Sequence, residues 1–85
     1  MTKTLPATFR PCNDASQPLF AVQPGIPLQD ALECVCCLLE SAEALAVLTT
    51  GGESPEQLGY ACSSLIEMAK ATLHACIEGM HKKNV

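Results

Sequence analysis

Two stretches decide the fold of this chain: LQDALECVCCLLESAEALAVL at residues 28–48 and PEQLGYACSSLIEMAKATLHACIEGM at residues 55–80. In both stretches apolar side chains recur every three or four residues, which is the spacing of one face of an α-helix. The connecting residues 50–54, TGGES, break a helix and end in a serine that can cap the next one. A connection this short places two helices side by side and antiparallel. The sequence therefore predicts a helical hairpin, with helices over about residues 27–49 and 55–80.

The apolar arc on each predicted helix is too wide for one neighbouring helix to cover. On the first helix the arc spans roughly 160° when successive side chains are placed about 100° apart. Four side chains would stay exposed after the two helices pack together: Leu38, Leu45, Ile66 and Leu73. A second copy of the chain would cover them. We therefore expect an all-α protein in which two hairpins form a homodimeric four-helix bundle, with these four side chains at the dimer interface.

The residues before the first helix are predicted to form an arm and a short clip. Residues 1–18 hold three prolines among polar residues, a composition that disfavours helices and paired strands. We expect a flexible, proline-rich arm there. An extended conformation of residues 19–23, LFAVQ, puts Phe20 and Val22 on one side and Ala21 and Gln23 on the other, before the turn-forming pair Pro24-Gly25. An extended clip is therefore expected to fold Phe20 onto the helices. The helical hairpin domain then covers residues 19–85.

The composition excludes several classes of protein. Apolar residues make up 48% of the chain, yet it has only two phenylalanines, one tyrosine and no tryptophan, which favours closely packed helices over a β-sandwich or barrel. The net charge is −4 and the five lysines and arginines are scattered, so no basic patch is available to bind nucleic acid. No apolar run approaches the roughly 18 residues of a membrane span. The first residues lack the apolar segment of a secretion signal, so we expect a cytoplasmic protein with reduced thiols.

The outer face of the first predicted helix is acidic. Its carboxylates have no lysine or arginine on the same helix to pair with, and they are Asp30, Glu33, Glu40 and Glu43. Such a stripe either keeps the helix soluble or binds a protein partner with a basic surface. Together with Phe20 of the clip, these residues are the candidates for partner binding.

Three cysteines lie close together in the first helix, at Cys34, Cys36 and Cys37. They point in different directions around a helix, which argues against a single metal ion bound by all three. Cys34, together with Cys62 and Cys76 of the second helix, is expected to fill space as a small apolar residue. Cys36 and Cys37 are placed towards the polar side, so peroxide sensing or a disulfide between subunits remains an alternative role for either thiol.

The second helix carries His74, Glu78 and His81 on one exposed face, at the spacing i, i+4 and i+7. A transition metal could be held from such a row, but a solvated charged face explains it as well. Gly51-Gly52 lies between two helices and is not followed by lysine, so it is not a phosphate-binding loop. The sequence shows no serine nucleophile motif and no recognisable pair of catalytic carboxylates. We predict no enzymatic activity, no catalytic residues and no cofactor.

Three segments resemble DUF3077, a family of small bacterial proteins of unknown function: LFAVQPGIPLQDAL at residues 19–32, LLESAE at residues 38–43 and LIEMAKA at residues 65–71. The resemblance covers about residues 19–80 and leaves the proline-rich arm outside. It implies a compact helical protein of the bacterial cytoplasm and brings no known catalytic residues. The family's usual alanine or serine at the positions of the clustered cysteines favours the space-filling role for those thiols.

The sequence as a whole favours a non-enzymatic protein–protein interaction or regulatory module that acts as a homodimeric helical bundle. The first alternative is a thiol-based redox sensor that uses Cys36 or Cys37. The second is a metal-binding bundle that uses His74, Glu78 and His81.

Overall fold

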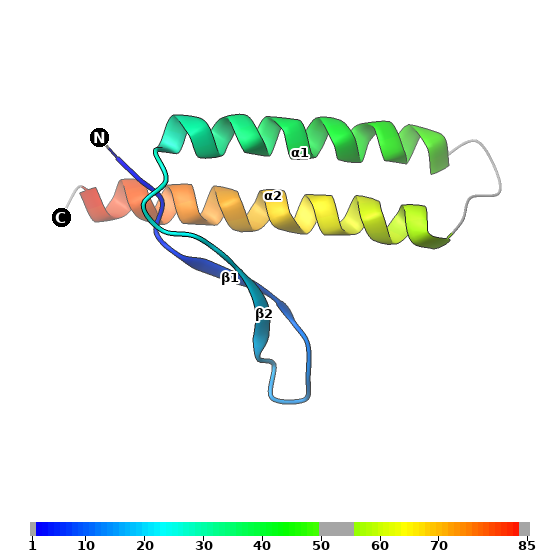
Figure 1. The fold of residues 1–85 in the computed structure, drawn as a ribbon, viewed down its shortest axis with the longest axis horizontal. Helices are drawn as coiled ribbons and strands as arrows, with labels where there is room; N and C mark the ends of the chain where they lie inside the picture. The colour runs from blue at the N-terminus through cyan, green and yellow to red at the C-terminus, as the bar shows by residue number, and fades with distance from the viewer. Residues whose placement is uncertain (1, 50–55, 84–85) are drawn as a thin grey trace.

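A computed structural model describes residues 2–49 and 56–83 of the chain. Its elements follow in the order β1 (Ala7–Pro11), β2 (Pro18–Val22), α1 (Leu28–Thr49) and α2 (Glu56–Lys83). The helices lie side by side and antiparallel, and the strands form a hairpin beside α2 (Figure 1). Both predicted helices are present, but the all-α class is wrong because the chain also forms a two-stranded sheet. The predicted connection at residues 50–54 and helix start at Pro55 lie outside the described residues.

The two helices pack through small side chains. α1 begins one residue after Pro27, whose carbonyl accepts a hydrogen bond from Ala31 N at 3.1 Å. α2 passes through Gly79 and continues to Lys83, three residues beyond the predicted end. Most of the buried apolar residues are alanines, and the set comprises Ala31, Val35, Ala42, Ala69, Ala71, Ala75 and Cys76. Side chains this small allow neighbouring helices to approach closely.

The arm predicted over residues 1–18 contains β1, so the expectation that it forms no paired strand is wrong, and residues 19–22 of the predicted clip lie in β2. β1 and β2 pair antiparallel, with Ala7 opposite Val22 and Phe9 opposite Phe20. The last pair of the ladder joins two prolines, at the end of β1 and the start of β2. Proline has no N–H to donate, and the end of a strand is where a sheet tolerates that loss. The prolines therefore mark the limits of the hairpin and do not prevent it.

Thr4 fastens the chain before β1 to the turn before α1. This residue is buried, and its main chain and hydroxyl both bond to residues 23–26. Thr4 N donates to Ile26 O at 2.8 Å, and Thr4 O accepts from Gly25 N at 2.9 Å. The hydroxyl donates to Gln23 O at 2.9 Å and accepts from Ile26 N at 3.1 Å. The predicted turn at Pro24-Gly25 is present, and Gly25 has the positive φ of 84° that favours glycine.

The same N-terminal segment contacts the last turns of α2. Leu5 N donates to the carbonyl of Ala75 at 3.1 Å, although Ala75 lies inside the helix. The backbone of Lys3 comes so close to Gly79 that a Cβ atom placed there would lie 1.9 Å from Lys3 O. The hairpin is thus held to α2 at its root as well as along β1.

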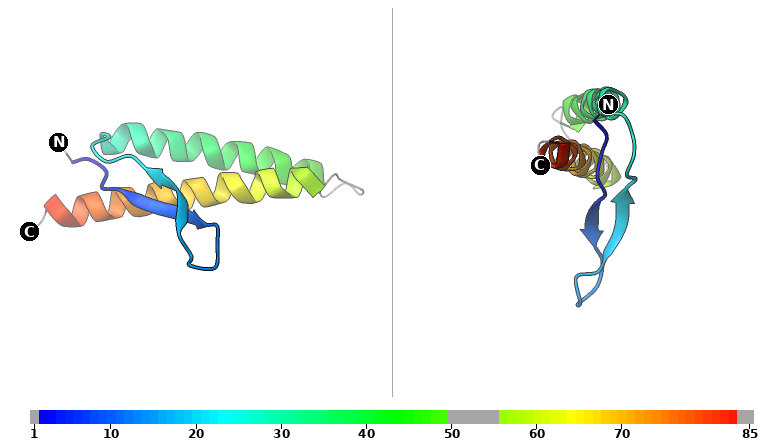
Figure 2. Two further views of the ribbon diagram at one scale, coloured as in Figure 1. Left: turned by 60° about the horizontal axis from the view of Figure 1, so that its bottom comes forward. Right: turned by 90° about the vertical axis from the view of Figure 1, so that its left-hand side faces the viewer.

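The molecule is a thin layer. The Cα atoms extend over 50 × 33 × 14 Å, and their radius of gyration is 14.9 Å, whereas a compact domain of this length has a value of about 12 Å. The hairpin packs against one side of the helix pair only, as the end-on view in Figure 2 shows. Among the described helices, neither has a segment long and apolar enough to cross a membrane.

Candidate functional site

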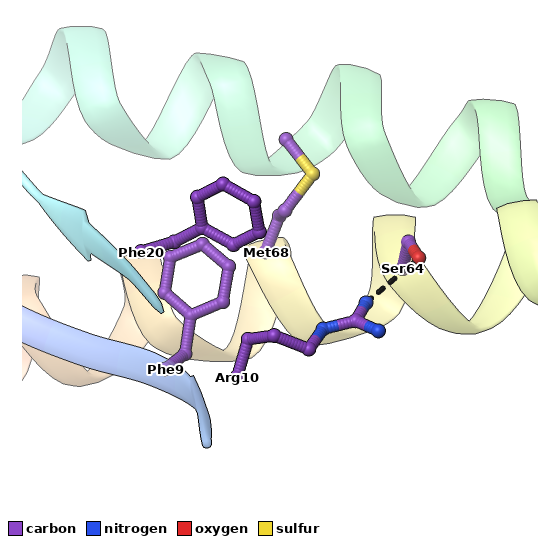
Figure 3. Close-up of a pocket in the computed structure, with 5 residues that line it drawn as sticks. All are labelled: Phe9, Arg10, Phe20, Ser64 and Met68. Carbon is purple, nitrogen blue, oxygen red and sulfur yellow. Dashed lines mark hydrogen bonds between the residues drawn. The ribbon is translucent and has the colours of Figure 1, made fainter. Parts of the chain in front are cut away.

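A pocket of about 370 Å³ opens where the hairpin meets α2 (Figure 3). Its lining combines two aromatic rings, a thioether and two polar side chains: Phe9, Arg10, Phe20, Ser64 and Met68. The rings face each other across the two strands, with centroids 5.6 Å apart and planes tilted by 36°. Such cross-strand aromatic pairs stabilise a hairpin and keep a large apolar surface at its face. Phe20 remains 51% exposed, so this surface is accessible from solvent.

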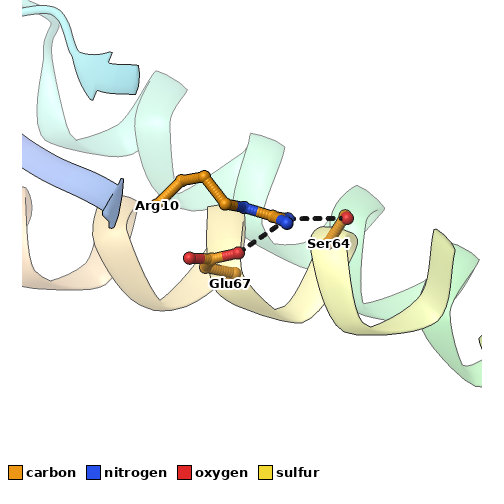
Figure 4. Close-up of polar contacts among 3 residues, drawn as sticks. All are labelled: Arg10, Ser64 and Glu67. Atoms are coloured by element: carbon orange, nitrogen blue, oxygen red, sulfur yellow. Dashed lines mark hydrogen bonds and ion pairs between the residues drawn. The ribbon is translucent and has the colours of Figure 1, made fainter. Parts of the chain in front are cut away.

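Arg10 closes one end of the pocket and ties β1 to α2 (Figure 4). Its Nη2 lies 2.8 Å from Glu67 Oε1 and donates a 2.8 Å hydrogen bond to Ser64 Oγ. The side chains of Arg10 and Glu67 are 41% and 34% exposed, so the ion pair contributes at most about 1 kcal/mol. The guanidinium charge is already compensated within the chain. The remaining lining of Phe9, Phe20 and Met68 suits an apolar group.

Sequence reasoning found Phe20 but missed the other four residues of the pocket. Phe9 and Arg10 fall in the segment that was predicted to be a flexible arm, and Arg10 adopts a positive φ of 62° that no local motif indicates. Ser64 and Met68 lie on the side of α2 that turns towards the hairpin. The pair Phe9 and Phe20 could have revealed the site, because the two aromatic residues lie opposite each other if their segments form a hairpin.

The opposite side of the helix pair carries a second apolar surface. Since Ser64 and Met68 face the hairpin and neighbouring residues lie about 100° apart around a helix, Ile66 and Ile77 point to the other side. The right-handed turn of α1 places Leu32 and Leu39 on that same side. We call this surface the open face, and it consists of Leu32, Leu39, Ile66, Leu73 and Ile77. Leu39 is 45% exposed and Ile66 is 42% exposed.

The four predicted interface residues are divided between the two sides of the layer. Ile66 and the half-buried Leu73 belong to the open face. Leu38 and Leu45 are half-buried and lie on the hairpin side of α1, because Leu38 is about 100° from Leu39 around the helix. A single flat contact with a second copy can cover only one of these pairs.

The predicted acidic and redox candidates are all exposed on α1. The four carboxylates, Asp30, Glu33, Glu40 and Glu43, lie on its outer surface as expected. Cys36 and Cys37 are exposed free thiols. Cys34 is also exposed, so the prediction that it fills space as an apolar residue is wrong.

The two cysteines of α2 behave as apolar filler. Cys62 is half-buried and donates from Sγ to Ala42 O at 3.4 Å. Burial raises the pKa of the Cys76 thiol through desolvation. Both thiols therefore contribute to packing between the helices.

His74, Glu78 and His81 are exposed on α2. Within residues 2–49 and 56–83, no group of three histidine, cysteine or carboxylate side chains is arranged to hold a metal ion. The metal-binding alternative gains no support from this geometry.

Comparison with known proteins connects the whole fold to one family. The model of the family described as "Protein of unknown function (DUF3077)" matches residues 4–82, which includes β1 and the anchoring Thr4 as well as the region of the predicted resemblance. Searches of curated proteins and of solved structures gave no match. The matched segment spans nearly the entire chain, and the chain therefore belongs to the DUF3077 family.

Proposed function

We propose that this protein is a non-enzymatic interaction module that acts as a homodimeric helical bundle. The open face carries this proposal, because it is a flat apolar surface on two packed helices. Domains normally bury such a face against a second layer, and the described residues supply only the hairpin, on the other side. A second copy supplies the missing layer with a surface of the same shape.

The total surface area supports this assignment. The chain exposes 6,024 Å², whereas a compact monomer of its mass exposes about 4,850 Å². The excess of about 1,200 Å² is larger than the roughly 800 Å² that each partner buries in a stable protein–protein interface. The excess exposed area is thus large enough to supply one such contact.

The pocket beside the hairpin is proposed as the surface that binds a different protein. It stays accessible when the open face is covered, because it lies on the other side of the layer. Phe9, Phe20 and Met68 present aromatic and thioether surface, which suits a large apolar side chain of a partner. The exposed carboxylates of α1, away from the pocket, suit basic residues elsewhere on the surface of the same partner.

Sedimentation equilibrium of the reduced protein at micromolar concentrations tests the dimer. We expect a dimer mass for the natural chain and about a tenfold higher dissociation constant for Leu39→Gln, since each copy then buries an amide in place of apolar surface. Ala44→Gln is the matched control, because Ala44 is exposed on the outer side of the same helix and its replacement should leave the dissociation constant unchanged. A natural chain that sediments as a monomer throughout this range would contradict the proposal.

A further inference from the structure

We infer that the open face binds a second copy in one orientation, with α1 of each copy lying antiparallel on α2 of the other. This inference rests on the proposed homodimer and adds which helices meet. It follows from the register between the helices and from the distribution of charge along the edges of the open face.

The contact between Cys62 Sγ and Ala42 O, at 3.4 Å, fixes which residues of α1 and α2 lie at the same height. Towards the N-terminus of α1 and the C-terminus of α2, Leu39 lies beside Ile66 about one turn from this contact, and Leu32 lies beside Leu73 about three turns from it. Each of these rows holds two large apolar side chains, and the rows are two helical turns apart. When two open faces meet, every row pairs with a row of the other copy and forms a layer of four apolar side chains.

Two twofold arrangements produce such layers. If the symmetry axis runs along the helices, α1 meets α2 of the second copy. If the axis lies in the interface and crosses the helices, α1 meets α1 and α2 meets α2. We call this second case the like-on-like arrangement. Apolar contacts do not distinguish the two arrangements, because both bury the same five side chains.

The charges at the edges of the open face do distinguish them. α1 contains acidic residues and no lysine or arginine, and exposed Glu33 and Glu40 border its edge of the face. On α2 the exposed Lys70 lies between the open face and β1, whose residues 8–11 line a small pocket together with Lys70 and His74. In the like-on-like arrangement two acidic helices lie together and Lys70 faces Lys70 of the second copy, which is unfavourable. In the α1-on-α2 arrangement Lys70 lies opposite the stretch between Glu33 and Glu40, where opposite charges attract.

This orientation determines what the dimer presents to other molecules. The two hairpins project from opposite sides of the bundle, since each packs on the side of its helix pair away from the open face. Both pockets formed by Phe9, Phe20 and Met68 stay accessible and face in opposite directions. A partner with two binding segments could occupy both pockets of one dimer only if the linker between the segments passes around the bundle.

Disulfide trapping tests the orientation directly. In a chain with Cys12, Cys34, Cys36 and Cys37 replaced by serine, we introduce Glu43→Cys and Ser63→Cys, which lie at the same height on opposite edges of the open face. Mild oxidation should yield a covalent dimer joined between position 43 of one copy and position 63 of the other. The two single replacements are the controls and should remain monomeric on a denaturing gel.

The like-on-like arrangement gives a different product. It brings Cys36 of the two copies together, so a chain that keeps Cys36 and lacks Cys12, Cys34 and Cys37 would oxidise to a dimer through Cys36. A dimer that forms this link, and does not join positions 43 and 63, overturns the orientation and leaves the proposed homodimer intact. A natural chain that sediments as a monomer overturns both.

Charge reversal provides an independent readout. Lys70→Glu should raise the dissociation constant of the dimer by about fivefold at low salt, since two favourable contacts become repulsive. The triple variant Glu33→Lys, Glu40→Lys and Lys70→Glu should return to within about twofold of the natural chain because the charges are exchanged. In the like-on-like arrangement Lys70→Glu replaces one like-charged pair by another, and an unchanged dissociation constant would overturn the inference.

Discussion

Replacing Gly79 by alanine is expected to destabilise the protein by about 3 kcal/mol, because the added methyl group enters occupied space. A Cβ atom at this position would lie 1.9 Å from Lys3 O and 3.0 Å from Lys3 C. Both atoms belong to backbone, so no side-chain rotation relieves the overlap. The segment around Lys3 must move away from α2, and the hydrogen bond from Leu5 N to Ala75 O is lost with it.

Gly59 provides the matched control within the same helix. It is exposed, and nothing lies within 4 Å of the place where its Cβ would be. Gly59→Ala should therefore stabilise the protein by up to about 1 kcal/mol, the gain in helix propensity alone. Urea unfolding followed by circular dichroism, at equal protein concentration for all variants, measures both changes. If Gly79→Ala proves as stable as Gly59→Ala, the close approach of Lys3 to α2 does not exist in solution.

The contrast between these two glycines shows how far the sequence predicts the fold. Both helices could be predicted because their apolar spacing is local and repeats over many turns. The importance of Gly79 could not, since the atom that approaches it belongs to Lys3, at the other end of the chain. From the sequence alone, Gly79 is indistinguishable from a glycine that ends a helix.

The hairpin was missed for a related reason. Pro11 and Pro18 disfavour a strand when each is considered by itself. Once β1 and β2 pair, the two prolines lie opposite each other at the end of the ladder and neither interrupts it. Because β1 was not predicted, Phe9 and Arg10 were not recognised as pocket residues. Phe20 was recognised because its extended segment precedes a clear turn.

The width of the apolar arcs predicted four exposed side chains, of which only Ile66 is exposed, while Leu38, Leu45 and Leu73 are half-buried. The arcs also could not show how these side chains divide between the two sides of the helix pair. The hairpin packs against α2 and contacts α1 with neither strand, so it lies on the same side of the helix pair as Leu38 and Leu45 without covering them. Ile66 and Leu73 remain on the other side, away from both described strands. The side of the helix pair that the hairpin leaves uncovered depends on the direction in which the chain turns between β2 and α1. The spacing of apolar residues within the helices does not determine that direction.

Thr4→Val should destabilise the protein by about 2 kcal/mol, because it removes a buried hydroxyl that makes two hydrogen bonds. Valine has the same shape, so packing is preserved while Gln23 O and Ile26 N lose a partner. The turn at residues 23–26 joins β2 to α1, and its loosening should release the hairpin before the helices separate. The backbone bonds between Thr4 and Ile26 remain, which limits the loss.

Thr4→Ser separates the hydroxyl from the methyl group and should cost less than Thr4→Val, since both hydrogen bonds persist. Amide hydrogen exchange locates the effect. In Thr4→Val the amide of Ile26 should exchange much faster, while amides in the middle of α1 and α2 keep the protection set by global unfolding. Equal stability of the valine and serine variants would mean that water replaces the hydroxyl in this turn, and that the backbone bonds of Thr4 to Gly25 and Ile26 are sufficient to hold it.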